Sequence, residues 1–425
     1  MDFKRFLLIL LFLFVATGLM FVGGQKESIA ADQKILNVLF QQSNIPDDKI
    51  VEGYAEEWAK KNNVKLNFQI VDENQLRSKT VAAIESKTGP DLIVFPDYSA
   101  FLYQDSLASI NELVDGLGEK YGGWFPIAKQ AFYYNGEWKG IPYKTFVKPL
   151  VYRKDVIDKV PDTWEELVQV SNEISKEDNG MYGFGVAIAP RSDGPNFIRS
   201  LLWSYGASIV DKNGNVVFNS KEAVEAFSLL KKWHEAGGMA PGVAGWDDSD
   251  NNRAFMAGKI AMTINASSIY SAAKKDFPDT LGKVTGHSVA PAGPAGRYGN
   301  ASSQCLGIPK YSNNQETAID FLKYLYTPEH LKAITTETDG GATMMLSGVI
   351  NDLPLWEDPD LKALLEVSKV SYLIGYPGKI TRAASAVRSE FILVNAAGRM
   401  LAEDLSPEEA VKMAHEQIVE IYSRF

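Results

Sequence analysis

The chain has 425 residues and a formal net charge of −10, from 53 acidic and 43 basic side chains. Nucleic acid and anionic lipid headgroups bind to positive patches, so an acidic chain of this kind is expected to bind neither. Cys305 is the only cysteine, which excludes an intramolecular disulfide and leaves stability to the packed core.

The first 30 residues are predicted to be a cleaved signal peptide. Lys4 and Arg5 precede an apolar run over 6–22, and Ser28-Ile29-Ala30 offers the small residues that a signal peptidase accepts. An uncleaved membrane anchor is the alternative, because a span takes about 17 to 25 residues. No cysteine lies near the cleavage region, which excludes a bacterial lipid anchor. We expect the mature protein to start at Ala31 and to reside in the periplasm.

The mature chain opens with strands and helices in alternation. Predicted strands cover 35–40, 64–70 and 91–95, and predicted helices cover 48–61 and 73–86. This alternation is typical of βαβ units on a mostly parallel sheet. About 395 mature residues exceed the size at which one core keeps growing, so two domains are expected.

Two later helices have clear start signals. Thr163-Trp164-Glu165-Glu166 and Ser406-Pro407-Glu408-Glu409 both place a hydroxyl cap three residues before a glutamate. Further helices are predicted over 223–236, 315–326 and 383–403, with loops over 189–196, 237–250 and 290–299. Trp203 and Trp233 lie inside apolar helical patterns and are assigned to the core.

A strand is predicted over 259–264, within the run RAFMAGKIAMTINASS. Asn265, Ser267 and Ser268 follow its carboxyl end. In open α/β sheets ligands bind beyond the carboxyl ends of strands, so these polar side chains are expected to face a cleft.

No enzyme or metal signature is complete. Residues 286–290 approach a nucleophile elbow but lack its last glycine, and phosphate-loop and dinucleotide motifs are absent. Residues 247–252 alternate oxygen ligands, yet Arg253 and Lys259 stand where a calcium loop needs glycine and glutamate. The four histidines have no metal-binding spacing. We expect no cofactor or metal. Paired carboxylates for glycoside chemistry stay open.

Several short segments occur together in a familiar order. They are GPDL at 89–92, GIPY at 140–143, LVYRKD at 150–155, PDTWEEL at 161–167, YGFG at 182–185, FMAGKIAM at 255–262, AIDFLKYL at 318–325 and NAAG at 395–398. Spread over nearly all of the mature chain, they resemble the extracellular solute-binding proteins of bacterial ATP-driven importers, in the family typified by maltose-binding protein.

The resemblance implies a type II periplasmic binding protein fold, with two α/β lobes of mostly parallel sheets flanked by helices. Implied crossing segments lie near 147–150, 299–304 and 341–349. The N-terminal lobe would comprise 31–147 and 300–345, and the C-terminal lobe 148–299 and 346–425. A solute held between the lobes stabilises the closed form, which the importer recognises. The implied partners are a small-molecule solute and ABC permease subunits, and the protein is expected to be a monomer.

Candidate ligand-binding residues match the cleft motifs of the family and carry the polar and aromatic groups that a sugar site needs. They are Gln42, Asn44, Asp97, Tyr98, Thr145, Phe146, Arg191, Asp193, Trp246, Ser267, Ser268, Tyr270, Ser302, Ser303, Gly341 and Tyr376. One position departs from the pattern, because Ser268 replaces the stacking tryptophan of the maltose-binding type. Tyr270 is the candidate substitute for that ring.

The expected function is to capture a mono- or oligosaccharide for a membrane permease, without catalysis. One alternative keeps the fold and binds an anionic solute, such as a phosphorylated polyol or a phosphodiester, through Ser268 with Arg191 or Lys148. The other alternative is a secreted glycoside hydrolase that uses Asp97 and Asp193.

Overall fold

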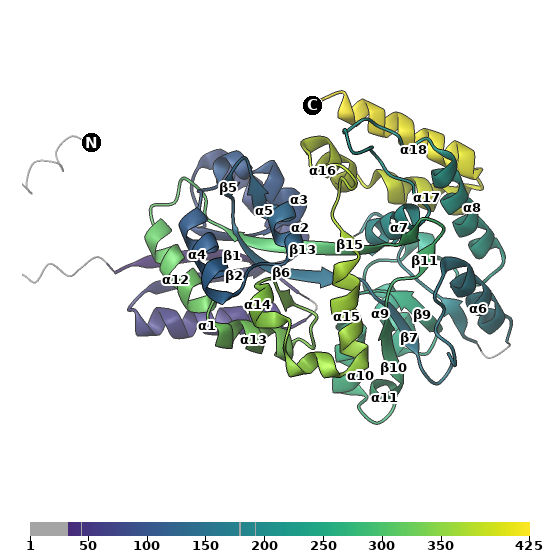
Figure 1. Ribbon diagram of the computed structural model, residues 1–425, viewed down its shortest axis with the longest axis horizontal. Coiled ribbons are helices and arrows are strands. Elements are labelled where there is room, and N and C mark those ends of the chain that lie inside the picture. The colour runs from purple at the N-terminus through teal and green to yellow at the C-terminus, as the bar shows by residue number, and fades with distance from the viewer. Residues whose placement is uncertain (1–32, 44, 178–179, 192) are drawn as a thin grey trace, which may run out of the picture. The chain divides into compact units, whose positions relative to one another are not determined.

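Two β-sheets organise the chain, and each is backed by its own helices (Figure 1). The computed structural model describes residues 33–43, 45–177, 180–191 and 193–425, and every element below belongs to the unit from Lys34 to Phe425. The predicted signal peptide and Asn44 lie outside the described residues. Within those residues, none of the helices is both long and apolar enough to cross a membrane.

The first sheet has the strand order β14-β6-β13-β3-β1-β2, and β15 pairs with β13. β1, β2 and β3 are mutually parallel, whereas β13 runs antiparallel to β3 and β6. All the side chains of 92–95 are fully buried, as the strand's continuous apolar run predicts. The bounds are β1 (Ile35–Gln41), β2 (Lys65–Val71), β3 (Leu92–Pro96), β6 (Ile141–Val147), β13 (Gly299–Gly307), β14 (Thr343–Met344) and β15 (Ser371–Tyr372).

The second sheet has the order β10-β7-β9-β8, in which only the β8–β9 pair is parallel. The bounds are β7 (Leu150–Arg153), β8 (Tyr182–Phe184), β9 (Ile260–Ile264) and β10 (Thr285–Ser288). Two small hairpins lie apart from the sheets: β4 (Tyr133–Tyr134) with β5 (Glu137–Trp138), and β11 (Ala292–Gly293) with β12 (Gly296–Arg297).

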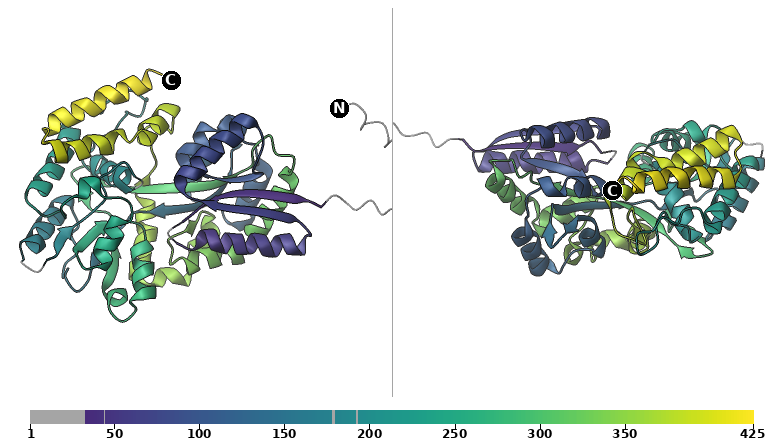
Figure 2. Two further views of the ribbon diagram at one scale, coloured as in Figure 1. Left: turned by 180° about the vertical axis from the view of Figure 1, so that it is seen from behind. Right: turned by 90° about the horizontal axis from the view of Figure 1, so that it is seen from above.

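Helices pack on both sheets. Those whose buried side chains join the first sheet are α1 (Asp47–Lys61), α2 (Glu73–Ser86), α3 (Asp97–Leu102), α4 (Asn111–Tyr121), α5 (Pro126–Phe132), α12 (Gln315–Leu325), α13 (Pro328–Glu337), α14 (Ser347–Ile350) and α15 (Pro359–Lys369). Those with the second sheet are α6 (Trp164–Lys176), α7 (Asp193–Ser204), α8 (Lys221–Glu235), α9 (Asp250–Met256), α10 (Ser268–Asp276), α16 (Arg382–Ser389), α17 (Ile392–Glu403) and α18 (Pro407–Tyr422). The short α11 (Leu281–Val284) has no buried side chain and packs beside α10. Single 3-10 turns cover Gln104–Ser106, Val243–Gly245 and Pro354–Glu357. Figure 2 shows α17 and α18 lying against each other near the C-terminus.

The chain crosses from the first sheet to the second between β6 and β7, with only Lys148 and Pro149 intervening. It returns in β13. The strand that leaves the first sheet and the strand that returns to it run in opposite directions, so strands next to the crossings pair antiparallel. The predicted two-lobe α/β fold is confirmed, but the sheets are mixed rather than mostly parallel.

The buried apolar side chains form two clusters, one in each lobe. Cys305, on β13, is completely buried in the first cluster. The predicted third crossing near 341–349 differs from the packing, because Leu346, Trp356 and Ile380 still belong to the first cluster and Ala383 opens the last segment of the second. We therefore propose moving that lobe boundary from 345/346 to 380/381.

The predicted helix starts are confirmed. Thr163 Oγ1 accepts the Glu166 backbone N–H at 3.1 Å, and Ser406 forms a complete capping box with Glu409. The predicted helix over 383–403 is wrong in one respect, since it divides into α16 and α17. Phe391 interrupts it with a φ of 58°, a left-handed conformation that ends a regular helix. Trp203 and Trp233 are core residues, as predicted.

The glycine of the YGFG segment permits a close approach of β8 to α6. A Cβ on Gly183 would lie 2.1 Å from Ser171 Cα and 2.3 Å from Ser171 O, and both are backbone atoms that cannot rotate away. The Gly183 N–H donates to Ser175 Oγ at 2.8 Å, which fixes the strand against the helix.

We predict that Gly183→Ala destabilises the protein by about 3 kcal/mol, the upper range for overpacking a core. Calorimetric melting measures the change. Gly245→Ala is the control in the same lobe, because a Cβ there meets no heavy atom within 4 Å. Equal melting temperatures for the two variants would show that β8 and α6 move apart to accommodate the added methyl group without loss of stability.

Candidate ligand-binding site

A pocket of about 360 Å³ is lined by residues from both lobes. Its volume is at the lower end of the range of about 300 to 1,000 Å³ that is usual for small-molecule sites. The lining residues are Gln41, Gln42, Ser43, Ile45, Asp72, Glu73, Lys144, Phe146, Lys148, Asp193, Asp248, Asn265, Ala266, Ser268, Gln304 and Gly341. We call it the main pocket.

The N-terminal wall is built from the ends of two parallel strands. β1 and β2 pair in register to their last residues, Gln41 and Val71, and the Gln42 N–H donates to Val71 O at 2.7 Å. The residues that follow, Gln42 and Asp72, are therefore neighbours at one sheet edge. Asp72 caps α2 by accepting the Gln75 N–H at 2.9 Å, which aims the start of that helix at the pocket.

The opposite wall comes from the end of β9, as the sequence predicts. The Asn265 side chain donates to Asn252 Oδ1, and Asn252 Nδ2 donates in turn to Ser268 Oγ at 3.2 Å. This chain of amides and a hydroxyl holds Ser268 at the pocket surface. A hydrogen-bonding group thus occupies the position at which a stacking ring is absent.

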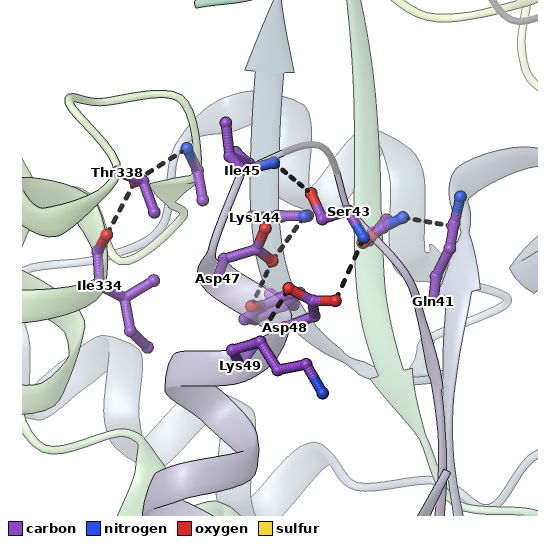
Figure 3. A network of polar contacts seen from close by, with 12 residues as sticks. Gln41, Ser43, Ile45, Asp47, Asp48, Lys49, Lys144, Ile334 and Thr338 are labelled. Carbon is purple, nitrogen blue, oxygen red and sulfur yellow. Dashed lines mark hydrogen bonds and ion pairs between the residues drawn. The ribbon is translucent and has the colours of Figure 1, made fainter. Parts of the chain in front are cut away.

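Both lysines of the pocket are neutralised by buried carboxylates. Lys144 Nζ lies 2.6 Å from Asp47 Oδ2, and Lys148 Nζ lies 2.7 Å from Asp193 Oδ1. Asp47 also accepts the Tyr143 hydroxyl at 2.8 Å. Figure 3 shows Lys144 reaching Asp47 at the start of α1. Since each cation already has a counter-ion, neither lysine provides an unpaired positive charge to the pocket.

The loop after β1 is held by the second aspartate of α1. Asp48 Oδ2 accepts the Ser43 N–H at 3.3 Å, and Ser43 Oγ accepts the Ile45 N–H at 3.4 Å (Figure 3). Burial raises the pKa of Asp48, and the hydrogen bond from Ser43 opposes that rise. The carboxylate fixes a loop that contributes several lining residues.

A second, smaller hollow of about 50 Å³ continues from the main pocket, and we call it the side hollow. Both are lined by Gln41, Glu73, Phe146 and Gln304. The side hollow adds Pro96, Asp97, Tyr98, Arg199, Ala301, Ser302, Ser303, Ile374 and Arg388. The Gln304 side chain donates to Gln41 Oε1 at 2.8 Å, which ties β13 to β1 at the junction of the two spaces.

The structure brings most of the predicted ligand-binding residues to these two spaces. Gln42, Phe146, Asp193, Ser268 and Gly341 line the main pocket, and Asp97, Tyr98, Ser302 and Ser303 line the side hollow. Thr145 and Ser267 are buried behind the lining. Thr145 Oγ1 donates to Ser302 O at 3.4 Å.

Tyr270 does not replace the missing stacking ring. Its side chain is 1% exposed, packs in the first hydrophobic cluster, and donates its hydroxyl to Asp358 Oδ2 at 3.1 Å. Burial and the Asp358 charge raise the pKa of this hydroxyl. Phe146 is the one aromatic residue among the described residues that line the main pocket.

Three other predicted residues lie away from both spaces. Arg191 is exposed, and its guanidinium donates to Pro190 O at 3.2 Å. Trp246 packs against the second cluster, with its ring over Gly185. Tyr376 lies 4.0 Å from the Tyr372 ring, between ring centres, and lines a separate hollow. Loop position alone did not reveal where these side chains point.

The sequence analysis missed several lining residues, namely Gln41, Ser43, Asp72, Glu73, Lys144, Asp248 and Gln304. A signal for Asp72 and Glu73 was present, because they follow a predicted strand parallel to β1 and open the next helix. Applying the rule of converging strand ends to β2 as well as β9 would have found them.

The site does not match either a metal centre or a glycosidase. Asp247 Oδ1 accepts Ser249 N–H at 2.8 Å, so the acidic loop caps its own turn into α9, and no group of three metal-ligating side chains occurs among the residues described. Asp97 and Asp193 line different spaces, and Asp193 is already paired with Lys148.

Comparisons with known proteins bear on the family and the fold of the chain. Residues 53–363, more than half of the chain, match the family model described as bacterial extracellular solute-binding protein. The maltotriose-binding protein of Pyrococcus abyssi (strain GE5 / Orsay) is 23% identical over 345 residues, which are 77% of this chain and 70% of that protein.

Two solved structures share the fold. Maltose-bound MalE3 of T. maritima aligns with a TM-score of 0.80 at 20% identity, over 91% of this chain and 99% of that one. A solute-binding protein of Agrobacterium radiobacter K84 in complex with ribitol aligns with a TM-score of 0.77 at 22% identity, over 93% and 99% of the two chains.

We predict that Gly341→Ala lowers solute affinity by about tenfold. Its new Cβ would lie 2.2 Å from Ser267 Oγ on the other lobe, and overpacking of about 1 to 3 kcal/mol corresponds to that loss. Calorimetric titration with the tightest-binding solute of a small-molecule panel measures it. Ser267→Ala in the same chain should restore most of the affinity, because it removes the clashing oxygen; no restoration would contradict the proposed contact.

We predict that Arg191→Ala leaves solute affinity within about twofold of the parent, since the exposed guanidinium bonds only its neighbour's carbonyl among the described residues. The same titration tests this. A clear loss would revive Arg191 as an anion-binding residue.

Proposed function

Because the chain belongs to the bacterial extracellular solute-binding protein family, we propose that it captures a saccharide or polyol between its lobes and delivers it to an ABC permease. Members of this family are transport proteins, so the chain is a binding protein and not an enzyme. The observation that carries the proposed ligand class is the main pocket, whose walls from both lobes consist mainly of amides, hydroxyls and carboxylates.

Hydroxyl-rich solutes suit these walls. The Gln41–Gln304 pair and the Asn252–Ser268 pair present both donors and acceptors, and each hydroxyl of a sugar needs both. Phe146 is half-buried and offers one apolar face to the ring. Maltose and ribitol in the related structures support a sugar or a polyol as the ligand.

Lobe closure is the proposed consequence of binding. A solute that touches Gln42 on one lobe and Ser268 on the other gains contacts only when both lobes surround it. Such a solute stabilises the closed form by its differential affinity. The two-residue crossing at Lys148 and Pro149 is short enough to act as one strand of the hinge.

The site of action in this proposal is the periplasm. The signal peptide over 1–30 is removed at export, and a monomer delivers the solute to the permease subunits in the inner membrane.

We predict that calorimetric titration with a panel of mono- and disaccharides and polyols yields a dissociation constant of about 1 µM or tighter for at least one member, equivalent to about −8 kcal/mol. Phe146→Ala should weaken that binding by about fivefold, because loss of the apolar face that contacts the solute costs about 1 kcal/mol. Small-angle scattering should show a smaller radius of gyration with the bound solute. A panel without any binder would refute the sugar and polyol assignment.

A further inference from the structure

The side hollow contains two arginines that the main pocket does not use. Arg199 comes from α7 and Arg388 from the last turn of α16, and both line this hollow. Neither guanidinium forms an ion pair with any carboxylate that the structure describes, whereas Lys144 and Lys148 next door are both paired. The two cations that lack a directly paired carboxylate among the described residues are therefore gathered at one end of the cleft, where the charge of Asp97 acts on both.

Arg199 belongs to a network with more donors than acceptors. Its Nη2 donates to Asn196 Oδ1 at 2.7 Å and to Asn300 Oδ1 at 3.2 Å. Its side chain is 5% exposed, and its Nε is buried without a partner among the described residues. The Nδ2 groups of both asparagines also lack acceptors there. Buried donors without acceptors cost free energy, so this network is incomplete without an acceptor from outside the chain.

Arg388 is placed by the break between α16 and α17. The left-handed residue Phe391 turns the chain just after it, and the guanidinium carbon lies 5.4 Å from the Phe391 ring centre and 5.9 Å from that of Tyr98. Aromatic faces hold a guanidinium in place and leave its N–H groups, which lie in the guanidinium plane, free to donate.

The acidic side chains nearby form no hydrogen bond or ion pair with these arginines in the part of the chain that the structure describes. Asp97 already accepts the Tyr98 N–H at 2.7 Å and the Ser303 N–H at 3.1 Å. Glu73 accepts the Tyr98 hydroxyl at 3.3 Å and lies at the junction with the main pocket. Burial, with a smaller effect from the neighbouring charge of Arg388, lowers the pKa of Arg199. An anion bound between the two arginines would offset both the burial of the Arg199 charge and the repulsion between the two cations.

We propose that the side hollow binds the carboxylate of a sugar acid or polyol acid whose hydroxyl-bearing part occupies the main pocket. The hollow of about 50 Å³ exceeds the roughly 10 to 15 Å³ that one water molecule requires on the same measure, which leaves room for a carboxylate. Guanidinium groups pair with planar carboxylates through two parallel hydrogen bonds. Ser302 and Ser303 line the same hollow. This inference rests on the proposed function and narrows its ligand class.

The test is calorimetric titration with matched pairs: galactose with galacturonate, glucose with glucuronate, and sorbitol with gluconate. Glucose 6-phosphate is added as a bulkier anion. We expect at least one acid to bind about tenfold or more tightly than its neutral partner. Arg388→Gln should abolish that preference while leaving affinity for the neutral partner within about twofold. Arg382→Gln is the control, because Arg382 lies on the same helix and faces the exposed Asp105 at 3.2 Å.

Each outcome is decisive. Neutral sugars that bind as well as the acids would overturn this inference and leave the proposed function intact, whereas no binding of any compound would overturn both. A preference for glucose 6-phosphate over every carboxylate would reject the carboxylate assignment. A changed affinity for the neutral sugars in Arg388→Gln, or a preference for the acid that survives this substitution, would contradict the selection of the acid by Arg388. If circular dichroism shows that Arg388→Gln does not fold, Arg388→Lys is used instead, because lysine keeps the charge and loses the bidentate geometry. A preference for the acid that Arg388→Lys fully retains would overturn the inference.

Discussion

The pocket depends on one short segment, the crossing from β6 to β7. Lys144 lies on β6 and Lys148 follows four residues later at the crossing itself. Each ammonium group pairs with a buried carboxylate of a different lobe, Asp47 in the first and Asp193 in the second. Breaking a buried pair by removal of one partner costs about 3 to 5 kcal/mol, so both lobes are anchored to this segment by interactions that are costly to lose. The remaining walls are arranged around it.

Local signals in the sequence predicted the elements well. The hydroxyl caps at Thr163 and Ser406 act as expected, because an N-cap depends only on residues within one turn. The end of β9 faces the pocket because strand polarity and sheet edge are properties of the whole fold class. Side-chain direction was harder to predict. Tyr270 and Trp246 are both near the cleft in sequence, yet packing against the two hydrophobic clusters turns them away.

The proposed shift of the third crossing has a similar cause. Nothing within 346–380 marks the lobe to which the segment belongs, because its helices are amphipathic and would suit either core. The pairing of β15 with β13 and the burial of Leu361, Leu364 and Val367 of α15 in the first cluster favour the first lobe, although α15 also packs on β10 of the second sheet. All of these contacts join residues that are distant in sequence. The lining residues Gln41 and Lys144 were missed for the same reason, because the residues that surround them in the pocket come from other strands.

The presence of Ser268 in place of a stacking ring changes which features of a ligand the pocket can distinguish. A flat aromatic face binds any sugar ring of similar shape, while the Asn265–Asn252–Ser268 chain has fixed donors and acceptors. For the proposed sugar or polyol ligand, recognition would then depend on the positions of individual hydroxyls, which would make the pocket sensitive to stereochemistry.

The single thiol of the chain has a practical consequence. Cys305 is sealed within the first core, and burial raises the pKa of its thiol well above the usual range, so the reactive thiolate is scarce. Maleimide reagents therefore have no accessible native target. Cysteines introduced in pairs, one on each lobe, would carry fluorescent or spin labels without background, and the distance between the labels would report the proposed closure of the lobes.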